Sequence, residues 1–308
     1  MIEDTFLKLK SNLELNPTFA EIVSQRQNAV RSVIQNNSAS VRSTRLIGSL
    51  LRQTRIQPRA IDDFDIDVVV VLGSFDRWVS GAAGISTEAA MNEVQRAVES
   101  ADRYSKLNPD QDHPTVTFDY TSKIKVELVP AYTDDISLES NGAPRASKGR
   151  AFWIPARNGS WELADYLYDA KYISIVNGDC NGLLIPTIKM LKAVKRWHFP
   201  AMKSWHLELI AVDLMPQILR EYQQRGLPPT YPHMVAECLY RLDAQLVQSR
   251  QLPGSVTPPF AIDPYTLAAI RPKIQWLGES ARQAYGANTD QDKHLIWKTI
   301  FGEVLPLP

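Results

Sequence analysis

Hydrophobic residues recur along this chain with two different periods, and the period changes near residue 48. In residues 4–35 they are spaced three or four apart, which predicts two helices separated near Pro17. Pro17 suits the first turn of the second helix, and Asn16 lies where its cap is expected. After a polar break, residues 41–48 are expected to form a further helix that ends at Gly48.

The patterns that follow are those of strands. Val68 to Leu72 is a run of mostly β-branched residues, which predicts a strand buried on both faces. Residues 113–120 alternate between polar and apolar and predict a second strand. A third strand is expected over residues 124–130, with Ile124, Val126 and Leu128 on one face and Lys125, Glu127 and Val129 on the other. We also expect a helix over residues 87–102 and a loop of small residues over 78–84.

The second part of the chain has helical spacing alone. It begins at Asn177 and is interrupted by proline-containing breaks, of which residues 251–264 are expected to form an ordered loop. Strands followed by helices predict an α/β (α+β) fold of two lobes with a cleft between them. We expect a mixed sheet in residues 1–165 and helices in residues 166–308, with the N-terminal helices packing across both lobes.

Composition and charge narrow the possible partners. Lysine plus arginine and aspartate plus glutamate number 34 each, so the net charge is zero. Proteins that hold long duplex nucleic acid usually carry a basic surplus, so we expect no duplex DNA activator. With 44% hydrophobic residues, no apolar run long enough to span a membrane and no secretory pattern, we expect a soluble cytoplasmic protein. Cys180 and Cys238 are expected to be reduced and structural.

Four acids crowd the start of the valine strand: Asp62, Asp63, Asp65 and Asp67. Because strand side chains alternate, Asp65 and Asp67 share one face, where their charges repel and favour a hard cation such as Mg²⁺. Asp63 with Asp65 is an alternative pair, but Asp67 directly precedes the valine run. If the strand at 124–130 lies beside the valine strand, Glu127 becomes a third carboxylate that can bind metal or act as a base.

Gly48 and Ser49 precede these acids and can form a phosphate-binding turn. Glycine lets backbone N–H groups approach a ligand, and serine adds a hydroxyl. The same segment is rich in arginine: Arg45, Arg52, Arg55 and Arg59. A Gly-Ser pair alone is usually only a loop, and an acidic turn is often only solvated. Their order within one short segment favours the arrangement that phosphoryl or nucleotidyl transfer requires.

Cations and histidines of the second part have simpler interpretations as well. Three lysines on one side of a predicted helix form either a solvated face or a cationic wall for phosphates: Lys189, Lys192 and Lys195. Three scattered histidines are interpreted as core or surface residues and not as metal ligands: His198, His206 and His233.

These motifs resemble the signature of polymerase-β-type nucleotidyltransferases. More narrowly, they are similar to the bacterial cGAS/DncV-like nucleotidyltransferases of CBASS antiphage systems. The segments that carry the resemblance are GSLLRQT, DFDIDVVVVL, VELVPAY, AFWIPARNGSW and NGLLIPTIKMLK. The match covers residues 40–215 and departs in one place, since the third acid of the family is usually aspartate and here it is Glu127.

The resemblance implies a polymerase-β-like nucleotidyltransferase core with a helical C-terminal lobe. It implies that Asp65, Asp67 and Glu127 are the catalytic acids and the ligands of two Mg²⁺ ions, with Mn²⁺ as a substitute. It also implies five nucleotide-binding residues: Gly48, Ser49, Lys192, Ser204 and Trp205. Of these, the glycine and the two serines would hold the triphosphate, the lysine would neutralise its charge, and the tryptophan would stack on a base.

The function implied by the resemblance is an ATP-binding, magnesium-dependent transferase. It would join ribonucleoside triphosphates into a cyclic di- or trinucleotide second messenger, whose effector acts in antiviral defence. Alternatives are a linear oligonucleotide synthase of the oligoadenylate type, a nucleotidyltransferase that modifies a small molecule, protein or tRNA, and a catalytically silent nucleotide-binding scaffold. We expect a monomer. The sequence leaves open the bases, the linkage, the ring size and the mode of activation.

Overall fold

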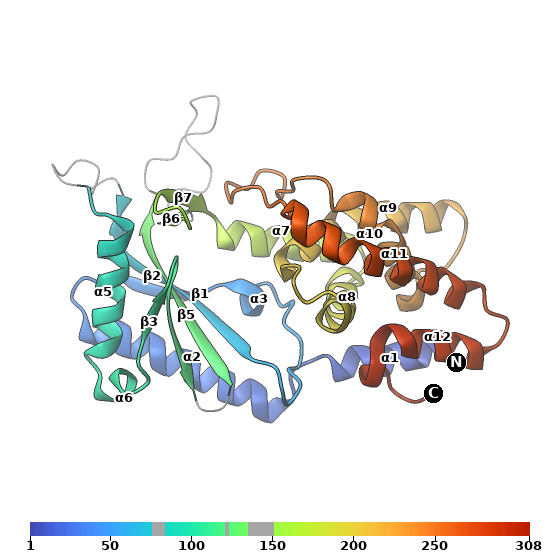
Figure 1. The fold of residues 1–308 in the computed structure, drawn as a ribbon, viewed down its shortest axis with the longest axis horizontal. Coiled ribbons are helices and arrows are strands. Elements are labelled where there is room, and N and C mark those ends of the chain that lie inside the picture. Colours follow the sequence, from blue (N-terminus) through green and yellow to red (C-terminus); the bar gives the residue numbers. More distant parts are fainter. Residues whose placement is uncertain (76–83, 121–122, 135–150) are drawn as a thin grey trace.

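The computed structural model describes residues 1–75, 84–120, 123–134 and 151–308. Its strands form one mixed sheet in the order β1-β2-β5-β4-β3, in which β6 also pairs with β5 and β7 pairs with β6 (Figure 1). The strands are β1 Ser43–Leu46, β2 Phe64–Ser74, β3 Asp110–Asp112, β4 Thr115–Tyr120, β5 Ile124–Thr133, β6 Phe152–Pro155 and β7 Trp161–Ala164. The mixed sheet is thus confirmed, whereas the loop expected over 78–84 lies almost wholly outside the described residues.

β2 is an inner strand of the sheet, between β1 and β5, and its valines are buried on both faces. One face meets the hydrophobic cluster that contains Phe64, Ile66, Val68 and Val70, and the other meets the cluster that contains Val69 and Val71. β2 and β5 run parallel, in a register that pairs Asp65 with Lys125 and Asp67 with Glu127. The condition for a third carboxylate beside the acid pair is therefore met.

Two helices cover one face of this sheet. α2 (Pro17–Asn37) and α5 (Thr87–Glu99) supply its cluster with valine, isoleucine and methionine side chains, and the short α6 (Asp102–Ser105) follows α5. α2 begins where the sequence indicates: the Asn16 side chain accepts a hydrogen bond from the amide of Phe19 at 2.8 Å, and proline follows at the first helical position.

The helix expected over residues 41–48 is wrong, because this segment is a strand. β1 pairs antiparallel with β2, with Thr44 opposite Val70. A strand of four residues has almost no pattern of its own, and its pairing with the valine-rich β2 decides the conformation. The short helix α3 (Gly48–Leu51) begins, and does not end, at Gly48.

The rest of the molecule is helical and surrounds a second core. Its elements are α1 Ile2–Asn12, α7 Tyr166–Asp179, α8 Leu184–His198, α9 Ser204–Gln224, α10 Tyr231–Gln245, α11 Pro264–Gly286, α12 Asp290–Phe301 and the 3-10 turn η1 Gly302–Val304. α7 starts before Asn177, where the helical spacing was expected to begin. α1 belongs to this core and lies beside α12 (Figure 1), since the Phe6 ring packs edge-on against Trp297 and Phe301 at centroid distances of 4.9 and 5.6 Å.

Cys180 and Cys238 are free and buried, as expected. In the part of the chain that the structure describes, we find no helix with the length and apolar character needed to cross a lipid bilayer.

Candidate active site

A cleft of about 1230 Å³ lies between the sheet and the helical part. It is lined by all eight residues singled out from the sequence: Gly48, Ser49, Asp65, Asp67, Glu127, Lys192, Ser204 and Trp205. Pockets for one small ligand usually measure roughly 300 to 1,000 Å³. The cleft is therefore larger than the usual site for one small ligand.

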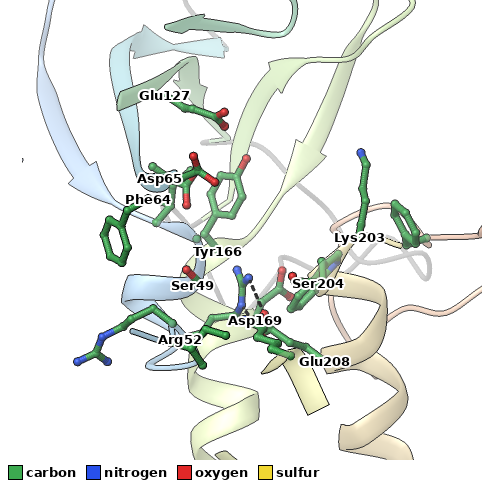
Figure 2. A pocket seen from close by; sticks show the side chains of 18 of the residues that line it. Ser49, Arg52, Phe64, Asp65, Glu127, Tyr166, Asp169, Lys203, Ser204 and Glu208 are labelled. Atoms are coloured by element: carbon green, nitrogen blue, oxygen red, sulfur yellow. Dashed lines mark hydrogen bonds and ion pairs between the residues drawn. The ribbon is translucent and has the colours of Figure 1, made fainter. Parts of the chain in front are cut away.

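The acids lie at the sheet end of this cleft. Alternation along β2 sends Phe64 and Ile66 into the core and turns Asp65 and Asp67 toward the cleft. Figure 2 shows Asp65 and Glu127 directed toward the same open space. Since the parallel register sets Glu127 opposite Asp67, the geometry favours the Asp65 and Asp67 pair over the alternative that begins one position before β2.

The negative charge of this group is under-compensated. Burial, together with the charges of Glu127 and Asp65, raises the pKa of Asp67 to about 7. Burial and the Glu127 charge also raise the pKa of Asp65. Lys125 lies 3.0 Å from the Glu127 carboxylate and offsets only part of the repulsion. A bound cation would relieve the remainder.

The donors fit a hard divalent cation such as Mg²⁺, because all three side chains offer carboxylate oxygens. Asp65, Asp67 and Glu127 are the residues that would hold it. Among the described residues, no three acidic, histidine or cysteine side chains already lie close enough together to enclose a metal ion. The identity and the number of the ions stay a prediction.

The turn at Gly48 lies directly against the acids. Its backbone has φ +67°, and a Cβ atom built on it would lie 1.8 Å from Asp67 Oδ2. The Ile47 amide donates to the Asp67 carbonyl at 2.9 Å, and the Ser49 carbonyl accepts from the Thr54 amide at 3.0 Å. Glycine is therefore required by both conformation and space, and Ser49 is held next to the acids.

The N-terminus of α9 opens into the same cleft. Ser204 and Trp205 are the first two residues of this 21-residue helix, and both line the cleft. The amides and the partial positive charge of a helix N-terminus favour phosphate. The Arg52 guanidinium lies 4.5 Å from the centroid of the Trp205 ring, so one of the ring faces is in contact with a cation.

Lys192 is buried and already bound to other groups of the protein. Its ammonium lies 2.6 Å from Glu208 Oε1 and donates to the carbonyl and hydroxyl oxygens of Thr54 at 2.9 and 3.1 Å. Arg52 donates to the same Glu208 carboxylate at 2.8 and 3.3 Å. An ammonium has three donors, so a direct contact of Lys192 with phosphate requires it to release a partner.

Glu208 is the centre of this network. Burial alone would raise the pKa of Glu208, but the charges of Arg52 and Lys192 lower it to about 2. The three side chains come from α9, α8 and the turn after α3, so their ion pairs join the helical part to the phosphate-binding turn.

Sequence reasoning assigned no role to Glu208, Asp169 or Tyr166, which all line the cleft. Asp169 accepts hydrogen bonds from the hydroxyls of Ser255 and Thr257 at 2.6 and 2.7 Å, which ties the proline-rich loop to α7. Glu208 could have been noticed as an acid inside an apolar helical run. Tyr166 carries no comparable signal; Figure 2 shows its ring between the acids and α7.

A family model described as the Second Messenger Oligonucleotide or Dinucleotide Synthetase domain matches residues 1–161. No curated protein sequence is significantly similar to the chain.

Solved structures match nearly the whole length. CdnC of Escherichia coli MS115-1, determined with ATP, is 15% identical with a TM-score of 0.69, covering 99% of both chains. CdnG of Bradyrhizobium diazoefficiens, determined with GTP, is 13% identical with a TM-score of 0.70, covering 98% of this chain and 96% of its own. The Vibrio cholerae cyclic AMP-GMP synthase DncV, a prokaryotic cGAS homologue, is 13% identical with a TM-score of 0.63, covering 86% of this chain and 70% of its own. These likenesses confirm the expected fold.

Proposed function

This chain belongs to the Second Messenger Oligonucleotide or Dinucleotide Synthetase family, as its resemblance to cGAS/DncV-like nucleotidyltransferases indicated, and we propose that it makes a cyclic di- or trinucleotide from ribonucleoside triphosphates. The observation that carries the proposal is the convergence of three carboxylates, a glycine-serine turn and a helix N-terminus on one cleft. Its volume suits two nucleotides held together. The product would be a second messenger that activates an effector in antiphage defence.

The residues have the following roles in this proposal. Ser49, the Gly48 backbone and the N-terminus of α9 hold the triphosphate of the donor nucleotide. A 2′- or 3′-hydroxyl of the second nucleotide attacks the α-phosphorus, its proton passes to Glu127 as base, and pyrophosphate leaves. A second round closes the ring.

Asp65, Asp67 and Glu127 would hold the metal ions of this reaction. When bound, Mg²⁺ or Mn²⁺ makes the attacking hydroxyl more acidic and offsets charge on the α-phosphate and on pyrophosphate. The raised pKa of Asp67 supports this assignment, because it reflects burial of the carboxylate together with the neighbouring charges of Glu127 and Asp65, which a bound cation would offset. The side chain of Glu127 is one methylene longer than that of the usual aspartate, and it projects from β5, the strand next to β2.

The direct test is product analysis. The purified protein is incubated with all four ribonucleoside triphosphates and Mg²⁺ or Mn²⁺, treated with phosphatase, and analysed by mass spectrometry. We expect a phosphatase-resistant product without terminal phosphates, whose mass identifies its bases. A product that loses terminal phosphates to the phosphatase would indicate a linear oligonucleotide synthase. No pyrophosphate release with either metal would contradict the proposal and favour a nucleotide-binding scaffold.

Asp67→Asn is the matched catalytic variant. It removes one metal ligand with little change of shape, so we expect turnover to fall at least about 10²-fold, as for loss of a preorganised electrostatic group. Asp63→Asn makes the same chemical change at an exposed position before β2 and should leave turnover near normal. Thermal unfolding checks that both variants are folded. Near-normal activity of Asp67→Asn would show that the acid pair is wrongly assigned.

A further inference from the structure

Most of the lysine and arginine side chains on and beside the helical side of the cleft, here called the helical wall, have an anionic partner. Arg52 and Lys192 share Glu208, Arg196 pairs with Asp62 at 2.7 Å, and Lys189 pairs with Glu14. Each of these partners offsets the cost of placing a cation where water is restricted.

Among the described cations that line the cleft, Arg55, Lys195 and Lys203 have no such partner; Lys203 is exposed and lies over the Phe260 ring, so Arg55 and Lys195 are the exceptions within the wall. Both are half-buried and both line the cleft. Among the residues that the structure describes, neither has an ion pair or a side-chain hydrogen bond, and Arg55 Nε is buried without any partner. Burial and the neighbouring charges of Lys192 and Arg196 lower the pKa of Lys195, which reflects the same lack of a counter-charge.

The backbone brings these two residues to one wall and holds them there. Thr54 is bonded to Lys192 of α8, and the Gln57 carbonyl accepts from Arg196 at 3.1 Å. Arg55 lies between Thr54 and Gln57 in the sequence, and Lys195 lies one turn beyond Lys192 on α8. The segment that carries Arg55 is therefore clamped to α8 on both sides of the pair.

Arg55 also lies next to the phosphate-binding turn, since its amide is 3.3 Å from the Ser49 carbonyl. The cleft is thus divided by charge, with three carboxylates at the sheet end and the unpaired cations on the helical side. A nucleoside triphosphate has the matching polarity: its α-phosphate must reach the acids, and its outer phosphates extend away from them. A planar guanidinium and an ammonium suit phosphate oxygens.

We propose that Arg55 and Lys195 form an anion subsite that holds the outer phosphates of a nucleoside triphosphate bound in the cleft. The subsite deepens the proposed function and rests on it for the identity of the ligand. It adds two residues to the triphosphate grip on a wall where Lys192 is already occupied by Glu208 and Thr54.

The test is equilibrium binding with probes that separate the phosphate tail from the nucleoside. The probes are AMP, inorganic tripolyphosphate and α,β-methylene ATP. In the last of these, a methylene group replaces the oxygen that bridges the α- and β-phosphorus atoms, so the analogue is not cleaved. Arg55→Gln and Lys195→Gln should each weaken binding of α,β-methylene ATP and tripolyphosphate about tenfold, as for loss of one charge-assisted hydrogen bond, and leave AMP unchanged. Arg55→Lys, which keeps the charge, should retain most of the affinity.

Arg220→Gln and Lys171→Gln are the controls for net charge, because both side chains are exposed and neither lines the cleft. They should leave all three affinities unchanged. Unchanged binding of α,β-methylene ATP in the Arg55 and Lys195 variants, or an equal loss of AMP binding, would overturn the subsite. If the unaltered protein makes no oligonucleotide but the tail-specific losses are found, the subsite stands and the proposed function fails.

Kinetics then identify which nucleotide supplies the tail. If the subsite holds the donor, the variants raise KM for the donor triphosphate by the same factor whether the acceptor is a triphosphate or a monophosphate. If it holds the acceptor, the variants lose the preference of the unaltered protein for a triphosphate acceptor. Kinetics that match the unaltered protein with both acceptors would contradict the subsite.

Discussion

The backbone of Gly48 passes so close to Asp67 that no side chain fits between them. In Gly48→Ala, the added methyl would lie 1.8 Å from Asp67 Oδ2, at a φ of +67° that alanine disfavours by roughly 1–2 kcal/mol. Either the turn or the carboxylate must move. Because displacements of about 1 Å near reacting groups typically cost about 10²-fold, we expect oligonucleotide synthesis to fall by at least this factor in a product assay.

Gly178→Ala is the control for this change. Gly178 lies in α7 with ordinary helical geometry, and a Cβ there would meet nothing within 4 Å. This variant should keep full activity and gain up to about 1 kcal/mol of stability, since alanine favours helix. Equal activity of the two variants would mean that the close approach of Gly48 to Asp67 has no role in synthesis.

At the scale of elements, Glu208 couples α9 to α8 and to the turn after α3. Glu208→Gln leaves Arg52 and Lys192 buried without their counter-charge, and loss of one partner from a buried ion pair typically costs about 3 to 5 kcal/mol. We expect a loss of this size in the free energy of unfolding, measured with urea at pH 7. A triphosphate nucleotide should raise the melting temperature more in this variant than in the unaltered protein, because its phosphates replace the lost charge.

Glu221→Gln, on the same helix, separates this effect from loss of any ion pair. Glu221 lies 2.6 Å from Arg241, but its side chain is 46% exposed, so its loss should cost less than about 1 kcal/mol and leave the nucleotide response unchanged. Similar behaviour of the two variants would contradict a coupling role for Glu208.

The limits of prediction from sequence also lie at this scale. The valine run, the acid pair and the helix cap at Asn16 were predictable because each depends on local alternation or on a local hydrogen bond. β1 was not, since its conformation comes from pairing with residues 22 to 28 positions away in the sequence and not from its own residues. The ion pair between Lys192 and Glu208 could not be predicted either, because the two side chains meet only where α8 packs against α9.

At the scale of the whole molecule, acid should weaken the fold through His206. This side chain is fully buried, both of its ring nitrogens lack partners among the described residues, and burial, with the Arg250 charge, lowers its pKa to about 4. The unfolded chain takes up the proton near pH 6.5, so the stability present above that pH declines as the pH falls toward 4. The decline amounts to about 3 kcal/mol at pH 4.

His206→Leu removes this titration, so the stability of the variant relative to the unaltered protein should rise by about 3 kcal/mol between pH 7 and pH 4. Urea unfolding across this range measures the difference. His294→Leu is the comparison, because its ring is only partly buried and should give a smaller change. Parallel stability curves for the His206 variant and the unaltered protein would rule out His206 as the source of acid sensitivity.

The packing of Phe6 against Trp297 and Phe301 has a consequence for biosynthesis. α1 is translated before the sheet and the other helices described here, yet the aromatic rings of α12 that pack against Phe6 are translated after them. The sheet with α2 and α5 can close its core during translation, because all of its strands and both covering helices precede α7. The helical half cannot, because the face of α1 that packs against α8, α10 and α12 stays incompletely covered until α12 has been made. The Phe6 side of α1 is therefore incompletely covered in the nascent chain until α12 has emerged, and closing the helical core requires a contact between Phe6 and Trp297, 291 residues apart in the sequence.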